Sequence, residues 1–314
     1  MSELTIKELY ESCYKELKLD WISGKSGQNR VAKVSEVNRP GLSLAGYFEY
    51  FRPERVQILG QGEYAYLQTL DNAKRLEMVG KMLSFKDLPC VIITHGREIT
   101  PEITEVSNRN NVAVFRSPLT TAHLIRELSA YLENRLAPME MVHGVLTVVY
   151  GLGVLIMGDS GSGKSECGLE LVKRGHILVS DDIVEVRHHP GELLVGSSGP
   201  LLKHYMEVRG LGIIDIKQMF GVSSVKDSAR IELVVKLELD KGDGEYDRIG
   251  LENKNMEILD VPVPEVVLPL RPGRNVAALL EVAALNQRLK QEGIYAARDL
   301  NKKLISRINE AHEK

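Results

Sequence analysis

The chain has 314 residues, of which 43% are hydrophobic and 26% are charged, and its formal net charge is −3. This composition is typical of a soluble globular protein, and the length is sufficient for two domains. The near balance of charge argues against nucleic acid as a partner. The three cysteines form no CxxC pair, and no apolar run approaches a membrane span. The first 20 residues hold mixed charges and no apolar run, so no signal peptide is expected there. A cytoplasmic protein outside the membrane is therefore expected.

The first part of the chain predicts alternating helices and strands. Apolar residues at helical spacing indicate an amphipathic helix over residues 4–19. Further elements are expected as strands at 56–59, 91–94 and 112–115 and as helices at 71–84 and 120–136. Pro138 ends the last helix. This alternation predicts a small α/β domain over residues 1–135, for which an assembly or regulatory role is expected.

Residues 136–314 predict a second α/β domain. Its expected strands are 145–150, 153–157, 176–180 and 230–239, and its expected helices are 166–174, 276–289 and 295–312. The alternation of apolar and polar residues over 230–239 indicates a strand buried on one face only. Three glycines within 241–252 indicate a mobile loop.

One complete phosphate-binding loop lies between the strand at 153–157 and the helix that follows it. The loop reads Gly158, Asp159, Ser160, Gly161, Ser162, Gly163, Lys164, Ser165, which fits G-x-x-x-x-G-K-[ST] without a mismatch. Its backbone N–H groups can cradle phosphate oxygens, Lys164 can reach the β- and γ-phosphates, and Ser165 can offer its hydroxyl to Mg²⁺. Cys167, just beyond the loop, is expected to be a small packed residue.

Two carboxylates, Asp181 and Asp182, follow the strand at 176–180. A strand–helix–strand unit normally makes its two strands parallel, so their ends lie at one edge of the sheet. At least one of the two carboxylates is therefore expected beside the phosphate loop, where it can bind Mg²⁺ or accept a proton from an attacking hydroxyl.

The remaining candidates each have a plainer alternative. His143 can assist proton transfer or be an ordinary turn histidine. Glu207 and Arg209, two residues apart on a predicted strand, can serve the site or form a surface ion pair. Arg248, in the glycine-rich loop, can stabilise phosphoryl charge or be solvated. The basic turn of residues 269–274 can hold a phosphate or begin the next helix.

Five segments in this order resemble the bacterial HPr kinase/phosphorylase family. They are 141–146, 158–165, 179–182, 207–214 and 269–274. The resemblance implies a bifunctional enzyme that phosphorylates a serine of the phosphocarrier protein HPr, using ATP or pyrophosphate. It also implies removal of that phosphate by inorganic phosphate, which releases pyrophosphate. The implied catalytic core resembles phosphoenolpyruvate carboxykinase, the implied assembly is a homohexamer, and sugar bisphosphates are implied activators.

The resemblance also implies roles for individual residues. Asp182 would be the general base toward the serine, and the acid in the reverse direction. His143, Lys164 and Arg248 would be active-site residues, and Ser165 and Glu207 would bind Mg²⁺. Segment 206–215 and the turn of Pro269, Leu270, Arg271, Pro272, Gly273 and Arg274 would matter most for phosphorolysis. A small-molecule P-loop kinase and a nucleotide-sensing switch without an acceptor are the alternatives.

Overall fold

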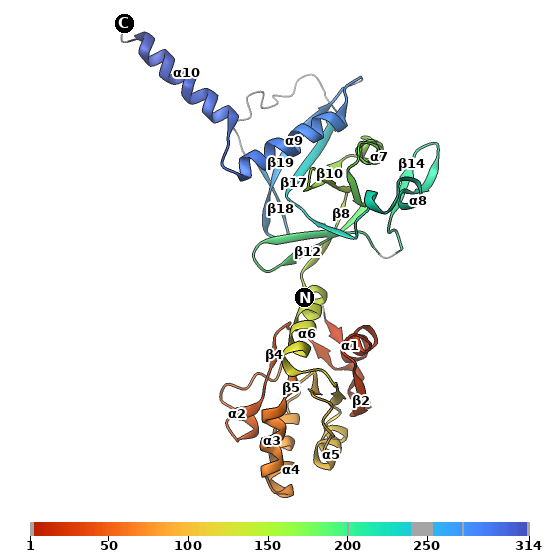
Figure 1. Cartoon of the computed structure of the whole chain (residues 1–314), viewed down its shortest axis with the longest axis vertical. Helices are drawn as coiled ribbons and strands as arrows, with labels where there is room; N and C mark the ends of the chain where they lie inside the picture. Colours follow the sequence, from red (N-terminus) through yellow and green to blue (C-terminus); the bar gives the residue numbers. More distant parts are fainter. Residues whose placement is uncertain (1–2, 200, 240–253, 272, 313–314) are drawn as a thin grey trace. The chain divides into compact units, whose positions relative to one another are not determined.

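The computed structural model describes residues 3–199, 201–239, 254–271 and 273–312. It divides into two compact units, Met1–Pro138 and Met139–Lys314, and Figure 1 shows the elements of each. Each unit combines helices with a central sheet that contains both parallel and antiparallel strands. The predicted α/β class is therefore confirmed. No helix in the described ranges is both long and apolar enough to cross a membrane.

The N-terminal unit is built on a five-stranded sheet with the order β2-β7-β6-β5-β4. Its strands are β2 (Asp20–Ser23), β4 (Val37–Asn38), β5 (Val56–Leu59), β6 (Cys90–Ile93) and β7 (Ala113–Arg116). Strands β4 to β7 are parallel, and β2 is an antiparallel edge. Every residue of β5 and β6 is buried, as expected when both faces of a parallel sheet are covered.

Helices cover both faces of this sheet. They are α1 (Ile6–Cys13), α2 (Gly41–Leu44), α3 (Gln61–Thr69), α4 (Asn72–Leu83), α5 (Pro101–Asn110) and α6 (Thr121–Leu136), with a 3-10 helix at Lys25–Asn29. One buried cluster joins α1 and α6 to the sheet, and another joins α3, α4 and α5 to it. A short pair, β1 (Leu4–Thr5) with β3 (Val31–Ala32), lies beside α1.

The predicted helix over residues 4–19 is wrong at both ends. Leu4 and Thr5 pair with β3 as a strand, and the helix begins at Ile6. The Thr5 side chain accepts a 3.2 Å hydrogen bond from the Glu8 backbone, and the Glu8 carboxylate accepts one from the Thr5 N–H. This reciprocal cap fixes the start of the helix. The helix ends at Cys13, and Leu17 and Leu19 are buried from the segment that follows.

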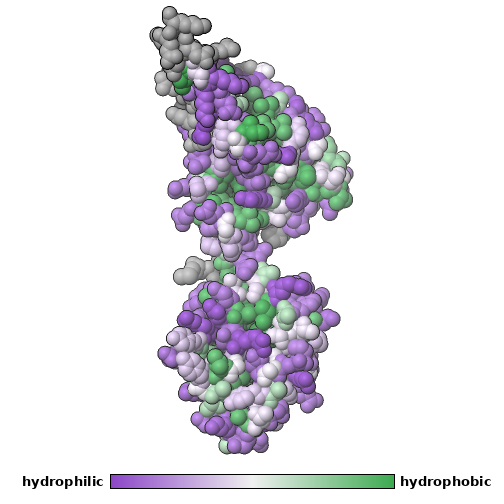
Figure 2. Space-filling model, turned by 60° about the vertical axis from the view of Figure 1, so that its left-hand side comes forward, coloured by the Kyte–Doolittle hydropathy of each residue, from purple (hydrophilic) through white to green (hydrophobic). Residues whose placement is uncertain are grey.

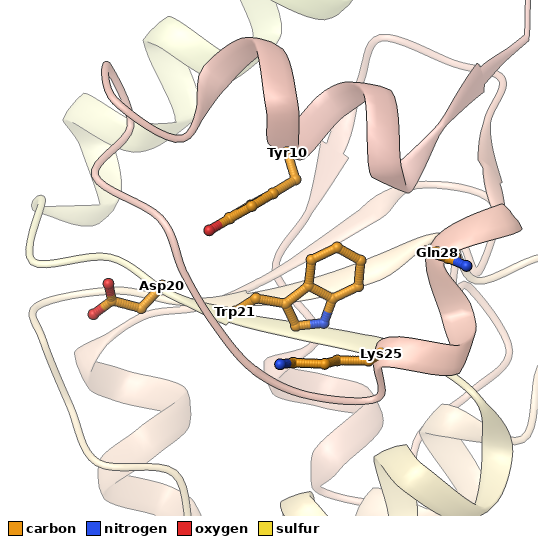
Figure 3. Close-up of a pocket in the computed structure, with 5 residues that line it drawn as sticks. All are labelled: Tyr10, Asp20, Trp21, Lys25 and Gln28. Carbon is orange, nitrogen blue, oxygen red and sulfur yellow. The ribbon is translucent and has the colours of Figure 1, made fainter.

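A pocket of about 430 Å³ opens on this unit between α1, β2 and the 3-10 helix. Figure 3 shows the five residues that line it, which are Tyr10, Asp20, Trp21, Lys25 and Gln28. The rings of Tyr10 and Trp21 meet edge to face with centroids 5.3 Å apart. Trp21 is the single tryptophan of the chain. Its fluorescence therefore reports on the N-terminal unit alone.

The C-terminal unit contains three sheets. The largest has the order β11-β9-β10-β17-β19-β18, the second β16-β13-β12-β8, and the third is the β14–β15 hairpin. Their strands are β8 (Met139–His143), β9 (Val145–Val149), β10 (Leu152–Gly158), β11 (Ile177–Ser180), β12 (Ile183–His189), β13 (Leu193–Ser197), β14 (Tyr205–Val208), β15 (Gly212–Asp215), β16 (Ser228–Arg230), β17 (Leu233–Leu239), β18 (Lys254–Ile258) and β19 (Val261–Leu270).

Side-chain alternation along the central strands separates two cores. Val154 and Ile156 of β10 face a cluster that includes α7 (Lys164–Lys173) and α9 (Val276–Gln291), whereas Leu155 faces β12 and β13 of the second sheet. The remaining helices are α8 (Ile216–Phe220), a 3-10 turn at Val222–Ser224 and α10 (Ala296–His312). On the visible face of each unit, Figure 2 shows hydrophilic surface broken by separate hydrophobic patches.

One sequence prediction needs partial correction here, and another is confirmed. Strand β17 runs over Leu233–Leu239 and lies parallel between β10 and β19. Leu233, Val235 and Leu237 pack into the first core and Val234 into the second, so the start of this central strand is buried on both faces. Beyond Val235 the prediction of burial on one face holds, because Lys236 is exposed. Strands β10 and β11 are parallel, as predicted, and β9 lies between them, antiparallel to both.

Candidate active site

The phosphate loop joins the end of β10 to the start of α7, as the sequence predicts. Gly158, Gly161 and Gly163 have φ angles of +153°, +84° and +82°, a region that L side chains rarely adopt. A Cβ on Gly158 would lie 2.7 Å from the Leu237 carbonyl oxygen of β17. The sheet and the backbone conformation therefore require glycine in this loop, at the N-terminus of a helix of 10 residues that favours anions.

Lys164 and Ser162 turn polar groups toward the loop. The Lys164 ammonium donates to the carbonyl oxygens of Gly158 and Asp159, at 2.8 and 3.0 Å. The hydroxyl of Ser162 is buried and has no hydrogen-bond partner among the described residues. A buried hydroxyl is stabilised by a partner, and a phosphate oxygen at the loop can supply one.

Asp181 ties three segments of the site together. One oxygen of its carboxylate accepts a 2.9 Å hydrogen bond from the Ser165 hydroxyl, and the other accepts a 3.0 Å bond from the Glu207 N–H. Only 6% of Asp181 is exposed, and burial raises the pKa of its carboxyl above the ordinary value. The sequence identifies the Asp181–Asp182 pair, but strand alternation alone does not say which carboxylate turns inward.

Asp182 and His143 face solvent together at the same edge of the sheet. Their side chains are 72% and 81% exposed, and His143 Nδ1 lies 4.0 Å from Asp182 Oδ1. Strand pairing sets this approach, because Ile183 lies opposite His143 and the Asp182 carbonyl oxygen accepts a 2.9 Å bond from the Gly144 N–H. A carboxylate and an imidazole are thus available next to the phosphate loop.

No ion pair joins Glu207 and Arg209 among the described residues. The surface ion pair that their spacing allows is therefore not formed. Glu207 belongs to β14, whereas Arg209 lies in the turn beyond it. The guanidinium of Arg209 approaches the phosphate loop instead, and a Cβ on Gly161 would lie 3.5 Å from each of its two terminal nitrogens.

The predicted turn at residues 269–274 is corrected at its start, because Pro269 and Leu270 are the last residues of β19 and pair with β17. Strands β10, β17 and β19 are parallel, so Gly158 and Leu270 end their strands on one side. Arg274 closes the turn on itself, with its N–H donating to the Arg271 carbonyl oxygen at 3.1 Å and its guanidinium to that of Pro269 at 3.2 Å. Pro272 and Arg248 lie outside the described residues.

ATP phosphates and Mg²⁺ fit these groups. The left-handed glycines leave the loop open to phosphate oxygens, and the buried Ser162 hydroxyl and the Lys164 ammonium are donors toward it. No group of three or more His, Cys, Asp or Glu is assembled for a metal in the part of the chain that the structure describes. That is compatible with Mg²⁺, which protein sites commonly bind through one or two side chains together with substrate phosphates.

Two family models match the chain. Residues 134–304 match the HPr Serine kinase C-terminal domain, and residues 4–132 match the HPr Serine kinase N terminus. The chain belongs to the HPr kinase/phosphorylase family. The resemblance indicated by the five sequence segments is thereby confirmed, and with it the class of enzyme.

Relatives in the HPr kinase/phosphorylase family match the chain along almost its whole length. The HPr kinase/phosphorylase of Bacillus cytotoxicus is 44% identical over 98% of both chains. That of Bacillus licheniformis is 47% identical over 93% of this chain and 94% of its own. A solved structure of the Hpr(Ser) kinase/phosphatase from Coxiella burnetii is 34% identical, with a TM-score of 0.46, and covers 49% of this chain and 93% of its own.

Proposed function

We propose that this protein phosphorylates a serine of HPr with ATP or pyrophosphate and removes that phosphate by phosphorolysis. The names of the relatives support the substrate and the two directions. The observation that carries the proposal is the placement of Asp182 and His143, 4.0 Å apart, next to the buried Asp181–Ser165 contact of the phosphate loop. A phosphate cradle and a solvent-facing base at one edge suit a hydroxyl acceptor that comes from another protein.

In the forward direction, Asp182 accepts the proton of the serine hydroxyl. The serine oxygen forms a bond to the terminal phosphorus of ATP or pyrophosphate, and the bond from that phosphorus to the leaving ADP or phosphate breaks. Positioning and charge neutralisation do most of the work in such a transfer. His143 lies where its imidazole can interact with the Asp182 carboxylate.

In the reverse direction, an oxygen of inorganic phosphate attacks the phosphorus of phosphoserine. The bond from phosphorus to the serine oxygen breaks, pyrophosphate forms, and Asp182 returns its proton to the serine. Microscopic reversibility requires the same group in both roles. The exposed position of Asp182 suits this exchange, because a proton can leave or reach it without a rearrangement of the core.

Charge at the phosphates would be neutralised by Lys164, the loop N–H groups and Mg²⁺. Ser165 and Glu207 would hold Mg²⁺, and Asp181 contacts both residues. When bound, Mg²⁺ neutralises phosphate charge and orients the phosphoryl group. Arg248 would serve the site from its loop, and the turn from Pro269 to Arg274 would serve phosphorolysis, since it leaves the edge where the phosphate loop lies.

The proposal extends to the assembly and its control. A core like that of phosphoenolpyruvate carboxykinase, a homohexamer, activation by sugar bisphosphates and a cytoplasmic location follow from the family resemblance. The N-terminal unit would have an assembly or regulatory role. It contains its own pair of buried clusters, which is consistent with a unit that folds around its own core.

One experiment separates this function from its rivals. The protein is incubated with Mg²⁺, ATP and purified HPr, and the modified residue is identified by mass spectrometry. A single phosphoserine on HPr is expected. A small-molecule kinase would leave HPr unmodified and turn over a metabolite, and a nucleotide-sensing switch would bind ATP without transfer, so either result would contradict the proposal.

A further inference from the structure

Arg209 is an exposed arginine at the tip of the β14–β15 hairpin, directly beside the phosphate loop. Both terminal nitrogens of its guanidinium lie 3.5 Å from the position that a Cβ on Gly161 would occupy. Within the described ranges, this guanidinium has neither an ion-pair nor a hydrogen-bond partner. A cation without a counter-ion therefore faces a loop whose backbone is shaped to bind phosphate.

The base of the hairpin is held in place, which fixes the position of its tip. Met206 and Val208 are buried in the cluster that contains α7. Between them, the Glu207 N–H donates to the buried carboxylate of Asp181, which is also bound to Ser165 of the phosphate loop. The hairpin and the loop thus share one anchor, and Arg209 lies only two residues beyond it.

The turn itself brings the arginine back over the loop. Gly210 and Gly212 have φ angles of +84° and +85°, and the Leu211 N–H donates to the Val208 carbonyl oxygen at 3.0 Å. Left-handed backbone at both glycines makes a tight reversal after Arg209. The lack of a side chain on Gly161 leaves the space between the guanidinium and the loop open.

We propose that Arg209 is a phosphate-contacting residue of the active site, which binds oxygens of the phosphoryl group held by residues 158–165. The inference rests on the proposed function of that site. A guanidinium offers two parallel N–H groups that match a phosphate, whereas an ammonium acts as a point charge. An arginine supplied by the same chain can stabilise the charge of a transferring phosphoryl group.

The test compares the full-length protein with its Arg209→Ala and Arg209→Lys variants. Arg230→Ala is the matched control, because Arg230 is also exposed but ends β16 in another sheet. Calorimetry measures the binding of pyrophosphate with Mg²⁺ in the absence of HPr, and rate assays give kcat for both directions. Arg209→Ala should weaken pyrophosphate binding and lower kcat, each by roughly 10- to 100-fold. The pyrophosphate affinity and kcat of Arg209→Lys should lie between those of the parent protein and those of Arg209→Ala. Arg230→Ala should match the parent protein in both.

Guanidinium ion added to Arg209→Ala should restore part of the lost rate, which a purely structural role does not predict. Wild-type pyrophosphate affinity and kcat in Arg209→Ala would overturn the inference. If the melting temperature of that variant falls, Arg209→Gln, which keeps a long polar side chain, replaces it. A parent protein that binds pyrophosphate but leaves HPr unmodified would contradict the proposed function alone. Transfer to HPr that is insensitive to Arg209→Ala would contradict the role of Arg209 alone.

Discussion

The hydroxyl of Ser165 donates a 2.9 Å hydrogen bond to the buried carboxylate of Asp181, which links the phosphate loop to the end of β11. The second oxygen of the same carboxylate accepts the N–H of Glu207. One side chain therefore aligns the two residues that would bind Mg²⁺. The two adjacent aspartates therefore differ in environment. Asp181 is buried in these contacts, whereas the Asp182 side chain is exposed and would be available for proton transfer.

Asp181→Ala should raise the Mg²⁺ concentration needed for tight ADP binding, because Ser165 and Glu207 lose their common partner. A double-mutant cycle with Ser165→Ala measures the contact. A coupling free energy of about 0.5–3 kcal/mol is expected for residues in direct contact. Additive effects of the two substitutions on the Mg²⁺ requirement would show that the contact does not position the site.

Asp182→Asn should abolish phosphorylation and phosphorolysis together, because the amide cannot accept the serine proton. Asp260→Asn is a close control. Asp260 is also exposed and also has a left-handed backbone, with a φ of +62° against +67° for Asp182. It lies in the β18–β19 turn, at the opposite end of β19 from the site. Both rates are measured on the same preparations, and retained phosphorolysis in Asp182→Asn would refute a shared acid and base.

Lys164→Ala should remove most of the affinity for ATP while the fold is kept. Among the described residues, the hydrogen bonds of the Lys164 ammonium go to backbone carbonyl oxygens of its own loop, at Gly158 and Asp159. Loss of a charged donor to phosphate should cost about 1.5–3 kcal/mol of binding free energy. Equilibrium binding of labelled ATP tests this, with an unchanged melting temperature as the check on folding. Parent-like affinity would mean that the loop does not hold the nucleotide as proposed.

Glu102 should make a pH-dependent contribution to the free energy of unfolding of the N-terminal unit. The N–H of its own backbone and the Arg75 guanidinium both hold the pKa of the Glu102 carboxyl below its ordinary value. Arg75 and Glu102 are 11% and 12% exposed and lie 3.2 Å apart. Because the pKa is lower in the folded state, the ionised Glu102 carboxylate stabilises the folded protein at pH values above its unfolded pKa, near 4.5. This stabilisation is lost as the pH falls through the pKa of Glu102 in the folded state.

Glu102→Gln should therefore lower the free energy of unfolding by about 1–2 kcal/mol at pH 7, and the difference should shrink below about pH 4. Urea unfolding followed by Trp21 fluorescence measures this, because the single tryptophan lies in the same unit. Glu98→Gln is the control, since Glu98 is exposed. A difference between Glu102→Gln and the parent that is constant with pH would contradict the electrostatic explanation.

Local chemistry made the phosphate loop and most helices predictable from the sequence. Its glycines, Lys164 and the preceding apolar strand are contiguous, and the helix over 72–83 begins at a capping aspartate, Asp71, whose side chain accepts from Lys74. Cys167 is packed as expected, and burial raises the pKa of its thiol to about 12. These features depend on residues that lie within a few positions of one another.

Strand pairing between distant parts of the chain could not be predicted from local sequence in this way. The insertion of β9 between β10 and β11 depends on partners that lie far away in the sequence, as does the burial of the first residues of β17 on both faces. The approach of Arg209 to Gly161 crosses 48 residues of chain and depends on how the hairpin is anchored by Asp181. The spacing of Glu207 and Arg209 suggested a shared strand face, but the strand ends at Val208.

In the proposed function, one site with one acid–base residue, Asp182, runs phosphoryl transfer in both directions. The most direct test is the product formed when inorganic phosphate and Mg²⁺ are added to the protein with serine-phosphorylated HPr. We expect pyrophosphate in an amount equal to the HPr that loses its phosphate, and none with Asp182→Asn. Loss of phosphate from HPr without formation of pyrophosphate would mean that water is the acceptor. That result would contradict phosphorolysis at this site.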